Sequence, residues 1–111
     1  MTHFLISLFD PPGIAEADLE AASRDSIAVV RDAQAAGVWV FGGGLLGRDA
    51  ASTVSIDGTV RDGMLHSSPE ILAGFCVVNV DSRDEAIEWA RKIAAACRSD
   101  QEVREFGPGS E

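Results

Sequence analysis

Hydrophobic and polar residues follow a period that changes several times along the chain, and each change marks a predicted element. The first apolar run, residues 4–9, has the length of a strand, and it stops before Pro11 and Pro12, which cannot donate hydrogen bonds to a sheet. From about Ala15 the apolar positions recur every three or four residues up to Ala33, which predicts an amphipathic helix. Gly37 is of the residue type that commonly ends a helix.

The middle of the chain predicts a strand, a hairpin and a second strand. Residues 38–41 are rich in β-branched and aromatic side chains and run into three consecutive glycines. Asp57 and Gly58 lie between the short segments 53–56 and 59–61, and this pair predicts a hairpin because the tight turn needs positive φ angles. Residues 62–74 form an irregular link, and residues 75–80 predict a buried strand.

A second helix and a last strand complete the pattern. Ser82 and Glu85 have the spacing of a capping box, which marks a helix start. An apolar stripe follows, made of Ala86, Ile87, Ala90, Ile93, Ala94 and Cys97. Residues 102–106 alternate as an edge strand does, and Gly107, Pro108 and Gly109 end it.

The order of these elements predicts a ferredoxin-like α+β sandwich of βαββαβ topology with a hairpin insertion. Each strand–helix–strand crossover is right-handed, so both helices cover the same face of one sheet. A chain of 111 residues supports one hydrophobic core and is too short for two. We therefore expect a single domain over residues 1–111.

The other face of the predicted sheet is also apolar in three strands. We expect Phe4, Ile6 and Leu8 opposite Leu5 and Phe9, Trp39 and Phe41 opposite Val38 and Val40, and Cys76, Val78 and Val80 opposite Phe75 and Val77. A monomer would expose a larger apolar patch than soluble monomers tolerate. We therefore predict a homodimer of the dimeric α/β-barrel type, in which a second subunit covers the open face and a ligand cleft lies between the sheets.

Composition and charge narrow the class of partner. The chain carries 18 acidic and 9 basic residues, for a formal net charge of -9, and it is 46% hydrophobic. The apolar content excludes a disordered tail, and the acidity argues against nucleic-acid binding, which needs clustered Lys and Arg. The longest apolar runs are about half of the ~20 residues that span a membrane, and the N-terminus has no signal-peptide pattern. We expect a cytoplasmic protein that binds neither nucleic acid nor membrane.

Two motifs suggest cofactor or metal binding, but the neighbouring sequence lacks the other parts that each kind of site needs. Gly42, Gly44 and Gly47 spell G-x-G-x-x-G after a strand, but a dinucleotide site also needs a helix that opens at the third glycine. These glycines are better explained by a bent strand or a close backbone approach. Cys76 and Cys97 lack the further ligands of a zinc site, because His3 and His66 do not complete one. We expect two free thiols in core positions, a structural or incidental His3, and no cofactor.

The candidates for acid–base chemistry are Asp62 and His66, which lie in the irregular link. A neutral imidazole near a carboxylate can act as a general base, with the carboxylate fixing its tautomer. The alternative is that His66 is a solvated surface residue. Asp10 caps the first helix, forms a turn or faces a pocket, and Trp89 lies off the apolar stripe, where it lines an interface or covers the helix edge.

Three stretches in order resemble the YCII-related (DGPF-domain) family. They are Asp62-Gly63-Met64-Leu65, then Leu72-Ala73-Gly74-Phe75, then Val80 to Ala90 with the sequence VDSRDEAIEWA. The family reads D-G-P-F, L-G-G-F and V-D-S-x-D-E-A-x-x-W-A at these places. The resemblance implies a dimeric ferredoxin-like domain in a family mostly of unknown function, with some small lyase-like enzymes and some domains associated with sigma factors. More distant relatives include cofactor-free monooxygenases and isomerases.

The chain departs from the family in ways that affect its chemistry. Met64 and Leu65 replace the proline and phenylalanine of D-G-P-F, and Ser26 and Ala35 stand where the enzymatic branch has a His and an Asp. One hypothesis is a dimeric YCII-like domain that binds a small metabolite in a cleft, with weak lyase- or isomerase-like chemistry carried by Asp62 and His66. The alternative is a non-catalytic dimerisation or protein-interaction module with a regulatory role, which the missing His–Asp pair favours.

Overall fold

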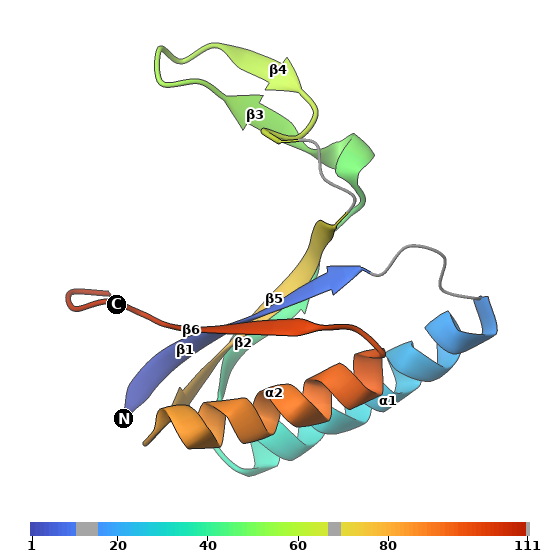
Figure 1. The fold of residues 1–111 in the computed structure, drawn as a ribbon, viewed down its shortest axis with the longest axis vertical. Coiled ribbons are helices and arrows are strands. Elements are labelled where there is room, and N and C mark those ends of the chain that lie inside the picture. The colour runs from blue at the N-terminus through green and yellow to red at the C-terminus, as the bar shows by residue number, and fades with distance from the viewer. Residues whose placement is uncertain (11–15, 67–69, 111) are drawn as a thin grey trace.

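The structure is a computed structural model that describes residues 1–10, 16–66 and 70–110 (Figure 1). The predicted start of the first helix at Ala15 and the turn at Pro11 and Pro12 lie outside these residues. The side chain of Asp10 is also not among those described, so its predicted role stays a prediction. The elements in chain order are β1 (Thr2–Asp10), α1 (Glu16–Ala35), β2 (Trp39–Gly44), a 3-10 turn (Arg48–Ala50), β3 (Ser52–Val54), β4 (Val60–Asp62), β5 (Ile71–Val80), α2 (Arg83–Cys97) and β6 (Gln101–Glu105).

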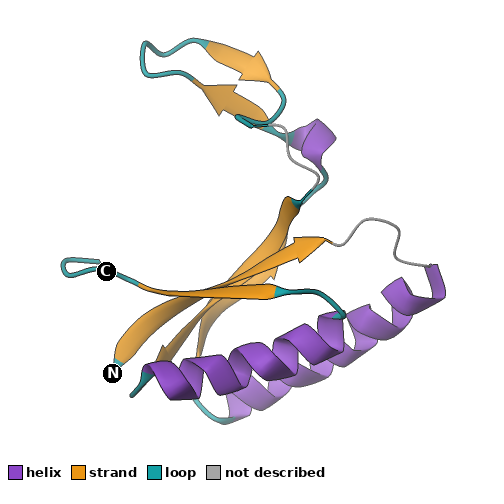
Figure 2. Ribbon diagram, viewed as in Figure 1, coloured by secondary structure: helices purple, strands orange, loops and turns teal. Residues whose placement is uncertain are grey.

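Four strands form one antiparallel sheet in the order β2-β5-β1-β6, and both helices cover one face of it (Figure 2). α1 connects β1 to β2 with β5 between them, and α2 connects β5 to β6 with β1 between them. β1 therefore pairs with β5 on one side and with β6 on the other. This is the predicted ferredoxin-like α+β fold. β3 and β4 form a separate two-stranded sheet, which is the predicted hairpin insertion. In the part of the chain described, no helix is both long and apolar enough to cross a membrane.

The core lies between the helices and the sheet. Phe4, Ile6, Val78 and Val80 are the largest fully buried side chains, and burial alternates strictly along the second half of β5. The helices contribute alanines to this core, among them Ala33, Ala86 and Ala90. Small side chains let the helices approach the sheet closely, so the larger strand residues fill the space between the layers. The predicted faces of β1 and β5 are confirmed for these residues.

The expected alternation in β2 is wrong, because the strand contains a bulge. Trp39 pairs with Val78, and Phe41 pairs with Val77, so Val40 is an extra residue in β2. Val38 and Trp39 both pack against the core instead of lying on opposite faces. The Phe41 ring instead contacts Phe75, with 6.5 Å between ring centroids.

The predicted caps and the hairpin turn are present. The backbone N–H of Glu85 donates to the Ser82 hydroxyl at 3.2 Å, and the Glu85 carboxylate accepts from the Asp81 N–H at 3.3 Å. Gly37, just past the end of α1, has a φ of 75°. In the hairpin, Gly58 has a φ of 89°, and the Asp57 carboxylate accepts from the Thr59 N–H at 2.9 Å. That hydrogen bond lowers the pKa of Asp57.

Gly42 gives a direct test of the close approach between β2 and β5. A Cβ at this position would lie 2.6 Å from the Cys76 Cβ and 2.8 Å from the Phe75 carbonyl oxygen. We expect Gly42→Ala to lower the free energy of unfolding by about 1–3 kcal/mol in urea titration, because two backbones must separate. Gly43→Ala is the matched control, since nothing lies within 4 Å of its added Cβ. Equal stability of the two variants would contradict this packing.

Candidate functional site

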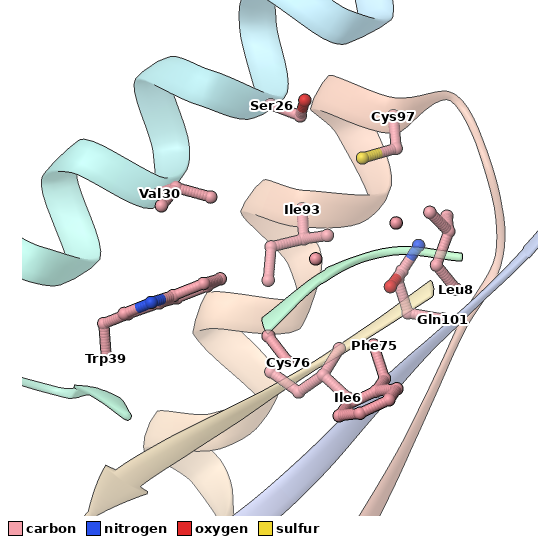
Figure 3. Close-up of a pocket in the computed structure, with 12 residues that line it drawn as sticks. Ile6, Leu8, Ser26, Val30, Trp39, Phe75, Cys76, Ile93, Cys97 and Gln101 are labelled. Carbon is pink, nitrogen blue, oxygen red and sulfur yellow. The ribbon is translucent and has the colours of Figure 1, made fainter. Parts of the chain in front are cut away.

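A cavity of about 220 Å³ lies between the two helices and the sheet. Figure 3 shows Ser26 and Val30 reaching it from α1, and Ile93 and Cys97 from α2. The sheet contributes Ile6, Leu8, Trp39, Gly43, Gly44, Phe75, Cys76 and Gln101. This cavity is built within one chain, and the cleft between two subunits that the sequence predicts stays a prediction.

The cavity wall is mostly apolar, and the Ser26 and Gln101 side chains bring polar groups to the end where α2 leads into β6 (Figure 3). Ser26 donates its hydroxyl hydrogen to the Ser23 carbonyl at 2.8 Å, which leaves its oxygen as an acceptor. The Gln101 amide donates to the Ser99 carbonyl at 3.3 Å. Val30 and Trp39 lie away from Ser26 and Gln101, and the Trp39 indole brings one N–H donor to that side (Figure 3). A ligand that fits both ends has an apolar body and a hydrogen-bonding group.

Two free thiols line the cavity, and both are held in the protonated form. Burial raises the pKa of the Cys76 thiol to about 11, and the nearby Cys97 adds to this effect. Burial also raises the pKa of Cys97, although the positive charge of Arg98 opposes it. A protonated thiol is a weak nucleophile and a weak metal ligand. Among the described lining residues there is no carboxylate or imidazole, and no group of three metal-binding side chains gathers anywhere in residues 1–10, 16–66 and 70–110.

The predicted acid–base residues lie elsewhere, on the hairpin. Asp62 ends β4 and is paired with Ser52, and His66 follows four residues later. Both are exposed, and neither lines the cavity. Their catalytic assignment stays a prediction, and it places the acid–base groups outside this cavity.

The two positions aligned with the family's His and Asp are separated in the structure. Ser26 lines the cavity, whereas Ala35 is exposed at the end of α1. Nine residues along a helix correspond to about 13.5 Å and a half turn of rotation. Ser26 and Ala35 therefore point in different directions, and only the first belongs to the site.

The sequence pattern missed the cavity although it identified much of its wall. Ser26 and Val30 are four residues apart on one helix stripe, and Ile93 and Cys97 are four apart on the other. This spacing predicts a shared face. It does not distinguish a filled core from a void, because that depends on the volume of the residues on the facing strands. Gln101 belongs to no motif or apolar stripe in the sequence, so nothing there indicated that it lines a cavity.

Three other residues singled out from the sequence, Trp89, Gly47 and His3, lie outside the cavity. Trp89 packs against the core with Lys92 Nζ 4.4 Å above its ring centroid, so it covers the helix edge. Gly47 precedes only a three-residue 3-10 turn, not the helix that a dinucleotide site needs. His3 lines a second hollow of about 170 Å³, on the sheet face away from the helices, with Val40, Val77, Phe106 and Ser110.

Comparisons with known proteins agree with this architecture. The profile of the YCII-related domain matches residues 1–106, and the chain belongs to the YCII-related family. Among solved structures it is similar to 5-chloro-2-hydroxyhydroquinone dehydrochlorinase (TftG) from Burkholderia phenoliruptrix AC1100, in complex with 2,5-dihydroxybenzoquinone. The TM-score is 0.59 at 20% identity, over 96% of this chain and 95% of that one. No curated protein sequence matches the chain.

The raised pKa of Cys76 predicts a loss of stability at alkaline pH. The unfolded thiol ionises near its ordinary value of 9.0 and the folded one near 11, so unfolding releases a proton between these pH values. The free energy of unfolding should therefore be unaffected below pH 9 and fall by up to about 2–3 kcal/mol as the pH rises through the folded value. Urea titrations at a series of pH values measure it. Cys76→Ala should flatten the slope, and an unchanged slope would contradict the assignment.

Proposed function

We propose that this protein binds a small, mostly apolar molecule of about one ring, with a hydroxyl or carbonyl substituent, in the cavity between helices and sheet. The observation that carries this proposal is the cavity itself, about 220 Å³ with apolar side chains from both layers. An apolar cavity of roughly 150 Å³ is large enough to hold benzene. A substituted ring is therefore the size class that the space accommodates.

The polar end of the cavity supports the choice of substituent. The Ser26 hydroxyl donates to the Ser23 carbonyl, so its oxygen is available as an acceptor, and the Gln101 amide, which donates to the Ser99 carbonyl, keeps a second N–H and its oxygen. The dehydrochlorinase with the same fold was solved with 2,5-dihydroxybenzoquinone, a ring of this size with groups of this kind. At 20% identity this likeness supports the size and class of ligand, and it carries no residue assignment.

Lyase-type chemistry would require a base that the cavity wall does not supply. Eliminating a small molecule from a ring needs a group that accepts a proton near neutral pH. The thiols are protonated there, and the described lining residues include no carboxylate or imidazole. We therefore place binding first. Any turnover depends on Asp62 and His66 approaching the ligand from the hairpin.

Filling the cavity should abolish binding. We expect Val30→Phe to weaken binding of 2,5-dihydroxybenzoquinone or hydroquinone at least tenfold in calorimetric titration, because the larger ring occupies the space. Ile27→Phe is the matched control, since Ile27 lies on the same helix and is 50% exposed. If Val30→Phe binds as tightly as the unmodified protein, the cavity is not the site.

Replacing His66 separates binding from catalysis. We expect His66→Ala to leave the affinity for these probes unchanged, because His66 does not line the cavity. If the protein also eliminates chloride from a chlorinated hydroxyhydroquinone, loss of a general base should lower the rate by about 10²-fold or more. Unchanged turnover in His66→Ala would remove the catalytic assignment, and Asp62→Asn tests its partner in the same assay.

A further inference from the structure

The Trp39 side chain brings a polar group to the otherwise apolar side of the cavity. Its indole ring lines the cavity and packs against the core. Among the described residues, no group accepts a hydrogen bond from the indole N–H. Tryptophan N–H groups usually have a hydrogen-bond partner when they are buried. A molecule that fills the cavity is therefore the partner that this donor requires.

The sheet topology places Trp39 and Gln101 at opposite corners of the cavity. Trp39 begins β2 and Gln101 begins β6, which are the two outer strands of the sheet, so three strand spacings of about 4.8 Å separate them. The pairing register puts Glu105 of β6 in the same row as Trp39. Gln101 lies four residues before Glu105, which adds about 14 Å along the strands. Figure 3 shows the two side chains on either side of Ile93.

The two corners differ in the hydrogen bonds that they offer. At the Gln101 corner, the Ser26 oxygen is free to accept, and the Gln101 amide keeps one N–H beside the one that it donates to the Ser99 carbonyl. A phenolic hydroxyl donates one hydrogen bond and accepts others, so this corner can satisfy both functions. The Trp39 indole is a donor only. An oxygen of the ligand is the group that it can bind.

We propose that the ligand of this cavity carries two oxygens on opposite sides of a six-membered ring, and that Trp39 selects the second oxygen. This inference rests on the proposed function, because it takes the cavity as the binding site. The first oxygen lies at the corner formed by Ser26 and Gln101, and the second accepts from the Trp39 N–H. Two substituents in a 1,4 arrangement are as far apart as a six-membered ring allows, so this arrangement best reaches both corners. Hydroquinones and 1,4-quinones belong to this class.

The test on the unmodified protein compares hydroquinone with 4-methylphenol in calorimetric titration, without oxygen so that the hydroquinone is not oxidised. The two probes have nearly the same shape and are uncharged near neutral pH, and a methyl group replaces one hydroxyl. An apolar wall alone would prefer the methyl group. We expect hydroquinone to bind at least about threefold more tightly, because 4-methylphenol leaves the Trp39 N–H without a partner.

Trp39→Phe should reverse this order. Phenylalanine keeps an apolar ring at the start of β2 and removes the donor, so the second hydroxyl of hydroquinone loses its hydrogen bond. We expect 4-methylphenol to bind at least about threefold more tightly than hydroquinone in this variant. The measurement is the ratio of the two dissociation constants, since a change in cavity volume affects both probes. Trp89→Phe is the matched control, because Trp89 lies outside the cavity and its loss should leave the order unchanged.

Catechol tests the spacing of the two oxygens. Its hydroxyls are adjacent, so when one lies at the corner formed by Ser26 and Gln101, the other stays on the same side of the ring. Neither then reaches the Trp39 N–H. We therefore expect Trp39→Phe to weaken the binding of hydroquinone at least about threefold more than that of catechol.

Two results would overturn the inference and leave the proposed function standing. One is equal or tighter binding of 4-methylphenol by the unmodified protein. The other is a Trp39→Phe variant that circular dichroism shows to be folded and that still prefers hydroquinone. If this variant does not fold, Trp89→Phe decides, because Trp39 is then the only tryptophan in the chain. Hydroquinone binding that leaves its fluorescence unchanged would also overturn the inference, whereas failure of every probe to bind would refute the proposed function itself.

Discussion

The structure depends on the close packing of two alanine-lined helices against one face of a four-stranded sheet. Ala33, Ala86 and Ala90 are buried against Phe4, Ile6, Val78 and Val80. An alanine adds little volume, so the helices come near enough for the strand side chains to exclude water. Burial of this apolar surface is the main favourable contribution to folding, and the crossover order places both helices on the same face.

The cavity follows from the same packing. Where alanines line the helices, the layers meet. Around the cavity the helices present other residues than alanine, namely Ser26, Val30, Ile93 and Cys97. On the sheet side, Gly43 and Gly44 of β2 have no side chain to fill the space. Gly42 and Gly74 belong to the same region, where the two backbones approach too closely for a Cβ. Tight strand pairing and an open cavity therefore have one origin in the glycines between β2 and β5.

The helices cover one face of the sheet, whereas the other face and the hairpin expose apolar side chains. The bulge at Val40 turns Phe41 outward, and the hairpin carries branched apolar residues into solvent. The acid–base residues proposed from the sequence belong to that projecting part, whereas the cavity belongs to the packed part. In the chain, the cavity and these two acid–base residues therefore lie in separate regions.

The sequence by itself determined the element order, the caps at Ser82 and Glu85, the hairpin turn at Asp57 and Gly58 and the family, because these depend on residues near one another in the chain. It also determined the buried faces of β1 and β5, since alternation is a local property. The cavity, the bulge at Val40 and the position of His66 outside the cavity were decided only by tertiary structure, whereas the different directions of Ser26 and Ala35 follow from the period of the predicted helix. These features depend on how the volumes of distant residues fit together and on the register between strands. The hydrophobic period of a single segment predicts neither.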